Sequence, residues 1–382
     1  MVKVLHIVEN FDGQATEKWL FQTLEELENN DNTIDWSFFC TLDQPGKYSH
    51  KIVEKGARIF CSPKPVSKLI PFMRFLRQTA RDGSYDVIHC HQDLMSAVYL
   101  LALIGLPIRK RIVHVHNTSL ELPTQNRLKS FILRRFFRLV CTLLADHIVG
   151  VSEEALGAFC RGAKSKSESV IHCGIDLLPF HYSKFTRSEF RETLGIPNDS
   201  IIMLFVGRMI DYKNPCFVLD VLGKMPPSQG NVYAIFAGAG PLEEAVKKVA
   251  DKKLLTERVK VLGWRDDIPS IMQSCDLLIW PGIEEPMEGL GLGVVEAQAA
   301  GLRVVMSLNV PTEAIIVPEL VETVPLAAGP KVWAETVVAS LGRGYLSKQE
   351  ALQNVEMSSF SIAASALNIK LLHDSIDVVK YN

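Results

Sequence analysis

The sequence predicts two α/β domains in tandem, each built around a doubly wound, parallel β-sheet. Short apolar, β-branched runs alternate with helix-length amphipathic segments from one end of the chain to the other. This pattern is expected when crossover helices cover both faces of parallel strands. The chain has 382 residues, more than a single hydrophobic core usually accommodates. We therefore expect two Rossmann-like domains.

Seven strands are predicted in the first half, at 3–8, 36–42, 58–61, 87–91, 111–116, 147–151 and 169–172. Six follow at 201–206, 232–237, 259–262, 277–280, 303–306 and 321–324, and helical patterns include 17–28, 69–81 and 128–144. The alternating pattern breaks off at 178–186, which is aromatic and irregular. A short predicted helix at 187–194 then stops at Gly195 and Pro197. We place the first domain at 1–182 and the start of the second at 183. The carboxyl ends of both sets of strands are expected to face a shared ligand-binding cleft.

The composition is that of an ordinary globular protein. Apolar residues make up 47%, charged residues 22%, and the formal net charge is −2. These values argue against a disordered chain and against a bulk nucleic-acid binder, so no nucleic-acid partner is expected. Eight cysteines contain no C-x-x-C pair, which indicates reduced thiols. With no signal-peptide pattern, and with an apolar stretch at 94–108 too short to span a membrane, we expect a cytoplasmic protein.

The most informative segment is 281–301, which follows a predicted strand. Gly289, Gly291 and Gly293 remove side chains from a strand-to-helix turn and leave backbone N–H groups able to face an anion. Glu288 precedes the turn and Glu296 lies about one helical turn inside the helix, so each carboxylate could accept hydrogen bonds from sugar hydroxyls. The alternative is a tight turn with two solvated glutamates.

A second strand end carries two cations. Arg208 and Lys213 follow the strand at 201–206 and together could neutralise a diphosphate. The alternative is a solvated surface loop. A third strand end has a G-x-G turn at Gly238, which is a weak dinucleotide signal. A fourth could supply Arg265 to a nucleotide base, unless the aspartate that follows it only caps the next helix.

These motifs resemble those of glycosyltransferase family 4, a retaining group with the GT-B fold. The matching positions in the second half are Gly207-Arg208 with Lys213, Gly238-Ala-Gly240-Pro-Leu, Gly263 with Arg265-Asp-Asp267, and the E-x7-E of Glu288 and Glu296. Those in the first half are 86–91, 111–118, 149–153 and 174–176. The resemblance covers nearly the whole chain and is strongest to the branch that builds bacterial exopolysaccharides and capsules.

The resemblance implies a nucleotide-diphosphate sugar as donor and a glycan or lipid-linked acceptor. Arg208 and Lys213 would bind the diphosphate, Glu288 the transferred sugar and Glu296 the ribose. Backbone amides of Gly289, Leu290 and Gly291 would face the phosphates, and Arg265 would lie near the base. His116 would reach the reacting centre from the first domain. In this family the leaving diphosphate is thought to draw the acceptor proton, so charge stabilisation is the main catalytic factor.

Two further assignments follow from the resemblance. The family's first loop usually reads Gly-Gly-Ala-Glu, whereas this chain has Gly13-Gln-Ala-Thr16, which retains Gly13 as a donor contact but places Gln14 where backbone would approach the phosphate. Residues 360–382 resemble the terminal helix that crosses back onto the first domain, so the second domain is 183–359.

No metal is predicted. No two aspartates are separated by a single residue, so the D-x-D motif of metal-dependent transferases is missing. His89, His91, His114 and His116 form two H-x-H pairs on strand ends, a spacing that could suggest zinc. We favour core and cleft roles for them, because no cysteine or carboxylate cluster in the sequence completes a site.

Residues Arg127 to Leu144 predict a basic helix with aromatic side chains. Such a helix can lie on an anionic membrane, here the inner face of the plasma membrane, where a lipid-linked acceptor would be presented. The alternative is a packed helix with one solvated cationic face. Two rival functions remain: a GT-B nucleotide-sugar epimerase or hydrolase, and a non-catalytic nucleotide-sugar-binding homologue. Analysing the products of donor incubated alone distinguishes an epimerase or hydrolase from a transferase. A sugar-transfer assay distinguishes a non-catalytic homologue from an enzyme.

Overall fold

The computed structural model describes residues 2–12, 15–29, 34–120, 122, 126–162, 165–344 and 346–375. The chain divides into two compact units, one of Met1–Ile175 with Ile362–Asn382 and the other of Asp176–Ser361. The boundaries predicted from the sequence are 182/183 and 359/360. Each unit contains one parallel sheet, as the predicted fold class requires. Every predicted strand is found, with both ends within two residues of the prediction.

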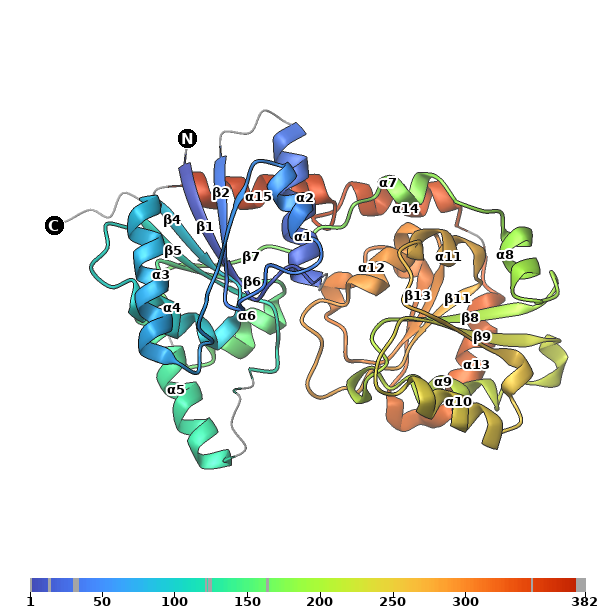
Figure 1. Ribbon diagram of the computed structural model, residues 1–382. Coiled ribbons are helices and arrows are strands. Elements are labelled where there is room, and N and C mark those ends of the chain that lie inside the picture. Colours follow the sequence, from blue (N-terminus) through green and yellow to red (C-terminus); the bar gives the residue numbers. More distant parts are fainter. Residues whose placement is uncertain are drawn as a thin grey trace. The chain divides into compact units, whose positions relative to one another are not determined.

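The strands of the first unit are β1 (Val2–Val8), β2 (Ile34–Cys40), β3 (Arg58–Cys61), β4 (Val87–Cys90), β5 (Lys110–Val115), β6 (His147–Gly150) and β7 (Glu168–Val170). They form one parallel sheet in the order β3-β2-β1-β4-β5-β6-β7. The helices are α1 (Ala15–Asn29), α2 (Ser49–Glu54), α3 (Leu69–Gly83), α4 (Ser96–Ala102), α5 (Arg127–Leu144), α6 (Glu153–Cys160) and α15 (Ile362–Asp374). Helices α3, α4 and α5 lie on one side of the sheet, and α1 and α15 on the other (Figure 1).

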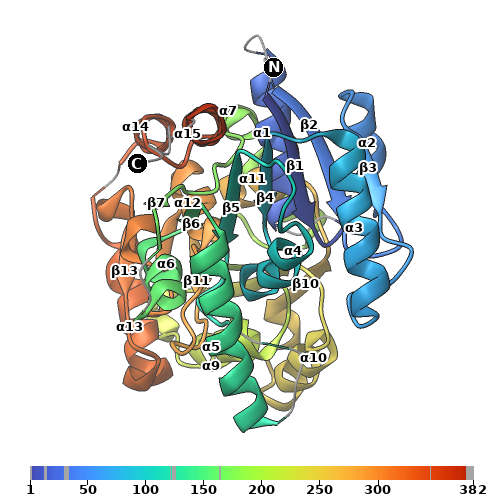
Figure 2. The same cartoon turned by 90° about the vertical axis from the view of Figure 1, so that its left-hand side faces the viewer.

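The end of the chain is built into the first unit. Helix α15 packs along α1 (Figure 2), and the indole Nε1 of Trp19 donates a 2.8 Å hydrogen bond to Ser365 Oγ. The Ser365 hydroxyl donates in turn to the carbonyl of His172 at 2.7 Å. At the other end of α15, Lys110 Nζ donates to the carbonyls of Leu372 and Ser375 at 2.7 and 2.9 Å. A cation at a helix C-terminus is favourable because it meets the negative end of the helix dipole.

The strands of the second unit are β8 (Ile201–Val206), β9 (Val232–Ala237), β10 (Val259–Gly263), β11 (Leu277–Trp280), β12 (Arg303–Met306) and β13 (Val321–Thr323). They form a parallel sheet in the order β10-β9-β8-β11-β12-β13. The helices are α7 (Leu178–His181), α8 (Arg187–Thr193), α9 (Pro215–Leu222), α10 (Glu243–Lys252), α11 (Ile268–Ser274), α12 (Leu292–Ala299), α13 (Gly329–Leu341) and α14 (Lys348–Glu356).

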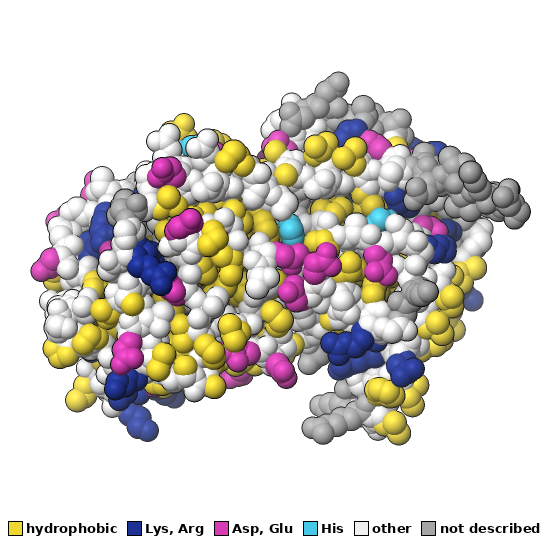
Figure 3. All heavy atoms as spheres, turned by 180° about the vertical axis from the view of Figure 1, so that it is seen from behind, with side chains coloured by type: hydrophobic (Ala, Val, Ile, Leu, Met, Phe, Trp, Pro, Cys, Tyr) yellow, Lys and Arg dark blue, Asp and Glu magenta, His cyan; other side chains and the backbone are white. Residues whose placement is uncertain are grey.

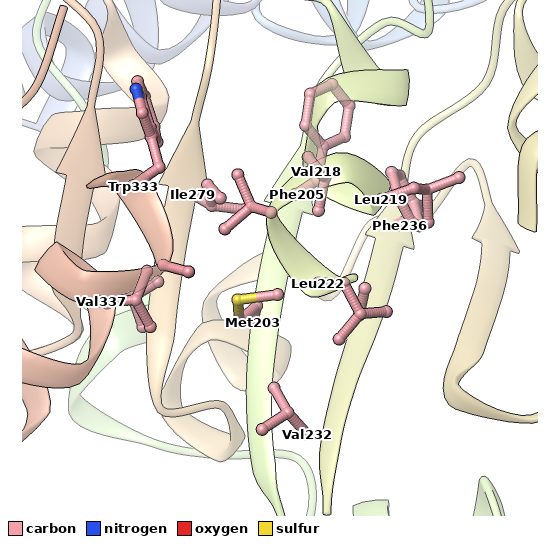
Figure 4. Close-up of a cluster of buried hydrophobic side chains, with 14 of the residues drawn as sticks. Met203, Phe205, Val218, Leu219, Leu222, Val232, Phe236, Ile279, Trp333 and Val337 are labelled. Carbon is pink, nitrogen blue, oxygen red and sulfur yellow. The ribbon is translucent and has the colours of Figure 1, made fainter. Parts of the chain in front are cut away.

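The core of the second unit lies between this sheet and helices α9 and α13. Figure 4 labels side chains of the cluster from β8, β9 and β11 and from these two helices: Met203, Phe205, Val218, Leu219, Leu222, Val232, Phe236, Ile279, Trp333 and Val337. All are buried, and each contributes about 1.5–3 kcal/mol for a side chain of this size. The apolar runs of the strands therefore hold the strand ends, and the loops that follow them, in fixed positions.

A buried ion pair anchors the start of the second sheet. The Arg191 side chain is fully buried, and its guanidinium donates to Asp276 Oδ2 at 2.8 Å and to the carbonyl of Ser200 at 2.7 Å. The same carboxylate oxygen accepts the backbone N–H of Ile202 at 2.8 Å. Asp276 thus joins α8, the beginning of β8 and the loop before β11.

In both sheets the strand order reverses beside the first strand, between β1 and β4 and between β8 and β11. The chain leaves these neighbouring strands towards opposite faces, and the crevice at such a reversal is where open α/β sheets bind ligands. These two strand pairs therefore indicate where each unit can hold a ligand. None of the described helices is both long and apolar enough to cross a membrane.

We expect Asp276→Ala to lower the free energy of unfolding by about 3–5 kcal/mol, because it leaves the buried Arg191 guanidinium without its counter-ion. Urea unfolding followed by circular dichroism would measure this. The matched control is Asp266→Ala, whose carboxylate is 76% exposed and lies 3.9 Å from Lys184; it should cost less than about 1 kcal/mol. Similar losses in the two variants would contradict the anchoring role of Asp276.

Candidate functional site

An ion pair joins the two loops that follow β8 and β11. Lys213 Nζ contacts Glu288 Oε1, and the two side chains are only 16% and 7% exposed. The ammonium also lies 4.3 Å from the centre of the Trp280 ring, a cation–π contact with the last residue of β11. Between the backbones, the N–H of Ile283 donates to the carbonyl of Tyr212 at 3.0 Å. Two predicted site residues, 75 positions apart, are therefore brought together.

The loop after β12 supports the backbone of Glu288, the acidic residue of this pair. The backbone N–H of Glu288 donates to the carbonyl of Asn309 at 2.7 Å, and the Asn309 side chain accepts from the Ser307 hydroxyl at 3.0 Å. Burial, and secondarily the Glu288 carboxylate, raises the pKa of the Tyr212 phenol above its ordinary value. The site is thus poorly solvated, and charges within it interact more strongly than in water.

The glycine turn has two different functions in the structure. Gly291 caps the N-terminus of α12 with a φ of 79°, a left-handed conformation that favours glycine. A Cβ on Gly293 would lie 2.6 Å from Cζ3 of Trp280, so this glycine makes room for the indole on which Lys213 rests. The missing side chain of Gly293 is therefore required for packing, a second function beside the exposure of backbone N–H groups that the sequence predicts for this turn.

The loops after β8 and β9 are also joined through their backbones. The N–H of Gly207 donates to Ala237 O and that of Met209 to Ala239 O, both at 3.0 Å. Gly240 has a φ of 159°, and a Cβ there would lie 2.5 Å from the carbonyl oxygen of Met209. The G-x-G turn that begins at Gly238 therefore permits close approach of two loops. Arg208 lies between these bonded residues with its side chain exposed.

The remaining predicted donor contacts lie on the same edge of the sheet. Glu296 is on α12 and is partly buried. Arg265 follows β10 and is exposed, and its Nε and Nη2 donate to the two carboxylate oxygens of Asp267 at 2.8 and 2.6 Å. This hydrogen-bonded pair lowers the pKa of the Asp267 carboxyl and raises that of Arg265. Asp267 makes no side-chain capping bond to α11, so it orients Arg265 and does not act as the helix cap that the sequence allowed.

His116, the site residue predicted from the first unit, follows β5 and belongs to a cluster of histidines. Its Nε2 lies 3.2 Å from His91 Nδ1, and its backbone N–H donates to Asp93 Oδ1 at 2.7 Å. Burial lowers the pKa of His116 to about 3, so the ring is neutral at pH 7. Sequence reasoning found four members of this cluster but missed His6 and His373, which join it from β1 and α15. Gly13 and Gln14 lie outside the described residues.

A cavity of about 450 Å³ opens beside these histidines at the β1/β4 reversal. Its lining includes His91, His116 and the carboxylates of Glu9, Glu17 and Asp93, and no lysine or arginine of the described residues contributes to it. Burial raises the pKa of Glu17 to about 7, assisted by the charges of Glu9 and Asp12 and opposed by a backbone hydrogen bond. Burial likewise raises that of Asp93 to about 6. The carboxylates of this cavity therefore lack a compensating cation among its lining.

Helix α5 has an exposed apolar stripe. Leu128, Phe131, Ile132, Phe136, Leu139 and Leu143 are each about half exposed or more, with values from 49% to 69%. Lys129 and Arg135 are exposed on the same helix, and nothing is described for the side chain of Arg127. Figure 3 shows hydrophobic and basic side chains side by side at its lower right, where this helix lies. The stripe occupies the i, i+3, i+4 positions of one helical face.

Two family models match the chain. The one described as "Glycosyltransferase Family 4" matches residues 17–177, and the one described as "Glycosyl transferases group 1" matches residues 186–322. Together these matches span most of the chain and divide near the boundary between the two units. The first therefore covers the sheet with the histidines, and the second covers the sheet with the Lys213–Glu288 pair.

Curated relatives and solved structures agree with these matches. The protein EpsF of Bacillus subtilis is 26% identical over 351 residues, covering 90% of this chain and 88% of EpsF. The capsular polysaccharide biosynthesis glycosyltransferase CapH of Staphylococcus aureus is 21% identical, with 90% and 92% of the chains covered. Among solved structures, Anabaena Alr3699/HepE in complex with UDP has a TM-score of 0.78 at 19% identity, with 97% and 99% covered. This chain belongs to the family 4 glycosyltransferases, and its two parallel-sheet units are the two Rossmann-like domains of the GT-B fold.

Proposed function

We propose that the protein transfers a hexosyl group from a nucleoside-diphosphate sugar to a glycan or lipid-linked acceptor in polysaccharide biosynthesis, with retention of configuration and without a divalent metal. The observation that carries this proposal is the poorly solvated Lys213–Glu288 pair at the β8/β11 reversal, beside the N-terminus of α12. Anabaena Alr3699/HepE has been solved with UDP and with UDP-glucose. An Escherichia coli relative, 26% identical over 64% of this chain, is named as a galactosyltransferase that uses UDP-Gal and a diphosphoundecaprenol acceptor.

The positive charges of this site explain how it would bind the diphosphate of the donor. In the absence of donor, Glu288 neutralises Lys213. A bound diphosphate would compete for this ammonium and would also face the exposed Arg208 and the amides of Gly289, Leu290 and Gly291 at the positive end of α12. A phosphate therefore meets fixed positive charge without a metal ion. The Glu288 carboxylate remains beside it and accepts hydrogen bonds from hydroxyls of the transferred sugar.

The same positive charges would assist departure of the diphosphate in the proposed reaction. In the proposed retaining reaction the bond from the anomeric carbon to the diphosphate breaks, and the leaving diphosphate draws the proton from the acceptor hydroxyl on the same face. Arg208 and Lys213 stabilise the charge that develops on the leaving group, an effect of the kind that dominates many enzymatic rate enhancements. His116, held neutral by burial, contributes a hydrogen bond at the reacting centre and not a charged acid.

We also propose that the enzyme is cytoplasmic and that helix α5 places it on the inner face of the plasma membrane. The exposed apolar stripe of α5 would enter the headgroup boundary, and its basic side chains would face anionic lipids. A lipid-linked acceptor is presented in that layer. The α5 stripe thus supports an acceptor carried on a membrane.

UDP should stabilise the protein in the presence of EDTA, because Arg208, Lys213 and the α12 N-terminus supply the compensating charge. At ten to a hundred times its dissociation constant, UDP should raise the free energy of unfolding by about 1.4 to 2.7 kcal/mol. Lys213→Ala should lose this stabilisation and reduce turnover by roughly a hundredfold, as should Arg208→Ala, whereas Lys224→Ala, at an exposed position of the same unit, should change neither. Stabilisation only after adding magnesium or manganese would sink the metal-free proposal.

Calorimetric binding measurements should distinguish the roles of Glu288 and Glu296. Glu296→Ala should weaken binding of both UDP and the sugar nucleotide by roughly 10 to 150-fold, the effect of losing a charged hydrogen bond to a ribose that both ligands contain. Glu288→Ala should weaken only the sugar nucleotide, because its loss frees Lys213 for the diphosphate. Equal losses of UDP affinity in both variants would show that the carboxylates support the turn and do not contact different parts of the donor.

The α5 stripe should bind anionic vesicles. The double variant Phe131→Ser/Phe136→Ser should reduce partitioning onto phosphatidylglycerol vesicles by about tenfold or more, given the apolar area removed from the bilayer. Leu371→Ser is the control, since Leu371 is 56% exposed on α15 of the same unit. Vesicle sedimentation measures the partitioning of each variant, and repeating it at low and high salt separates the apolar contribution from that of the basic side chains. Equal partitioning of the double variant and the wild type would leave the membrane proposal without support.

A further inference from the structure

The cavity at the β1/β4 reversal contains an acidic side chain with unused hydrogen-bonding capacity. Glu17 of α1 lines this cavity of about 450 Å³ and is only 7% exposed. Its Oε2 is buried and makes no hydrogen bond within the described residues. A buried polar atom without a partner is costly, and each such atom calls for an explanation. In the wall of a cavity, the explanation that fits is a ligand that donates a hydrogen bond to it.

Two other polar side chains of the lining are already engaged within the protein. The two carboxylate oxygens of Asp93 accept from the backbone N–H of His116 at 2.7 Å and from Asn117 Nδ2 at 2.8 Å. The side-chain oxygen of Gln92 accepts from the Tyr99 hydroxyl. These groups shape the cavity, whereas the unused carboxylate oxygen on α1 remains available to a ligand.

Helix α1 is fixed beside His116, so the backbone that carries Glu17 is well positioned. Trp19, two residues further along, is 1% exposed, and its ring centre lies 6.0 Å from that of His116. Its carbonyl accepts the Thr23 hydroxyl at 2.7 Å, and its indole Nε1 donates to Ser365 of α15. A binding group held in this way loses little freedom when a ligand arrives, which favours affinity.

The size and the mixed polarity of the cavity suit a sugar. Its volume lies in the range of about 300–1,000 Å³ that is typical of ligand pockets. A pyranose can pack its C–H face against apolar side chains while its hydroxyl groups donate to acidic ones. The apolar part of the lining consists of Val8, Leu42, Val66, Leu94 and Met95.

The charges of the lining argue against an acidic sugar and against a metal ion. An acidic sugar would add a negative charge to a lining that contains Glu9, Glu17 and Asp93 and, among the described residues, no lysine or arginine. A metal ion needs several ligands that converge, and no carboxylate of this cavity belongs to a converging group of three within the described residues. Burial raises the pKa of Glu17 and of Asp93, as expected for carboxyl groups without a counter-ion.

We propose that this cavity holds an uncharged sugar residue of the acceptor, and that Glu17 accepts a hydrogen bond from one of its hydroxyl groups. Glu17 then both binds the acceptor and selects against acidic sugars. The inference rests on the transfer reaction proposed above, in which His116, another lining residue, lies at the reacting centre. A phosphate that joins the acceptor to a lipid would have to lie outside this cavity, for the same electrostatic reason.

Saturation-transfer NMR on the full-length protein tests the selectivity. The probes are the methyl glycosides of glucose, galactose and mannose, each paired with its uronic-acid counterpart, at pH 8, where Glu17 and Asp93 are ionised. At least one neutral glycoside should bind. Its acidic counterpart should bind at least about tenfold more weakly, because like charges repel strongly in a poorly solvated site.

Two variants assign this selectivity to the acidic lining. Glu17→Gln should weaken the neutral glycoside by roughly tenfold, the difference between a charged and a neutral hydrogen bond. It should also raise the midpoint of urea unfolding at pH 8, because it removes a buried charge that has no counter-ion. Leu42→Lys, at a lining position that is 40% exposed, should reduce the preference for the neutral glycoside to less than about threefold by compensating the acidic charge.

The matched control is Glu25→Gln, on the same helix with a side chain 39% exposed, which should bind the glycosides like the wild type. UDP binding in EDTA is measured on the same samples, because it tests the donor site independently. Selective glycoside binding by a protein that does not bind UDP would contradict the proposed function but support the role of the cavity.

Three results would overturn the assignment of this cavity. The first is a protein that binds UDP but none of the neutral glycosides, and the second is equal binding of a neutral glycoside and its acidic counterpart. The third is a Glu17→Gln variant that binds the neutral glycoside like the wild type and unfolds at lower urea, since Glu17 would then only stabilise the fold.

Discussion

The ion pair between Lys213 and Glu288 joins the two loops that diverge where the strand order of the second sheet reverses. Its position follows from packing on both sides: the ammonium rests on Trp280, and Trp280 fits because Gly293 has no side chain. The backbone of Glu288 is held from the β12 loop, because its N–H donates to the carbonyl of Asn309. Three strand ends therefore determine one pair of charges, and the geometry of the donor site depends on that pair.

A buried ion pair is an expensive element, since both ions lose their hydration. Its value here is that the charges are already oriented and partly desolvated before a ligand arrives, so little reorganisation remains. The sites at the two sheet reversals differ in the charges that they present. The second unit presents cations with one internal carboxylate, whereas the cavity of the first unit presents carboxylates and neutral imidazoles without a cation. An anionic ligand suits the former, and a neutral or cationic one suits the latter.

The strands, and the strand-end loops that carry the candidate donor residues, could be predicted from sequence because both depend on local patterns. Apolar runs mark the strands, and the functional residues of an α/β domain usually lie in the loops that follow these runs, as Arg208, Lys213 and Glu288 do. What could not be predicted depends on distant partners. Nothing in the sequence says that Lys213 meets Glu288, or that Gly293 makes room for Trp280. His6 and His373 were missed because strand order and the return of α15, not sequence spacing, bring them to His89 and His91. The bidentate pairing of Arg265 with Asp267 is local, but the sequence alone does not distinguish it from an Asp267 that caps the next helix.

The return of α15 to the first unit has a consequence for how the chain is made. The strands of that unit emerge from the ribosome before the second unit, but the helix that pairs with Trp19 and the carbonyls that bind Lys110 emerge after it. All of Asp176–Ser361 is synthesised in between, which at typical rates takes roughly 10 to 40 s. During that interval the face of α1 is uncovered, and the second unit is complete before the first. Loss of the C-terminal residues would therefore damage the N-terminal unit.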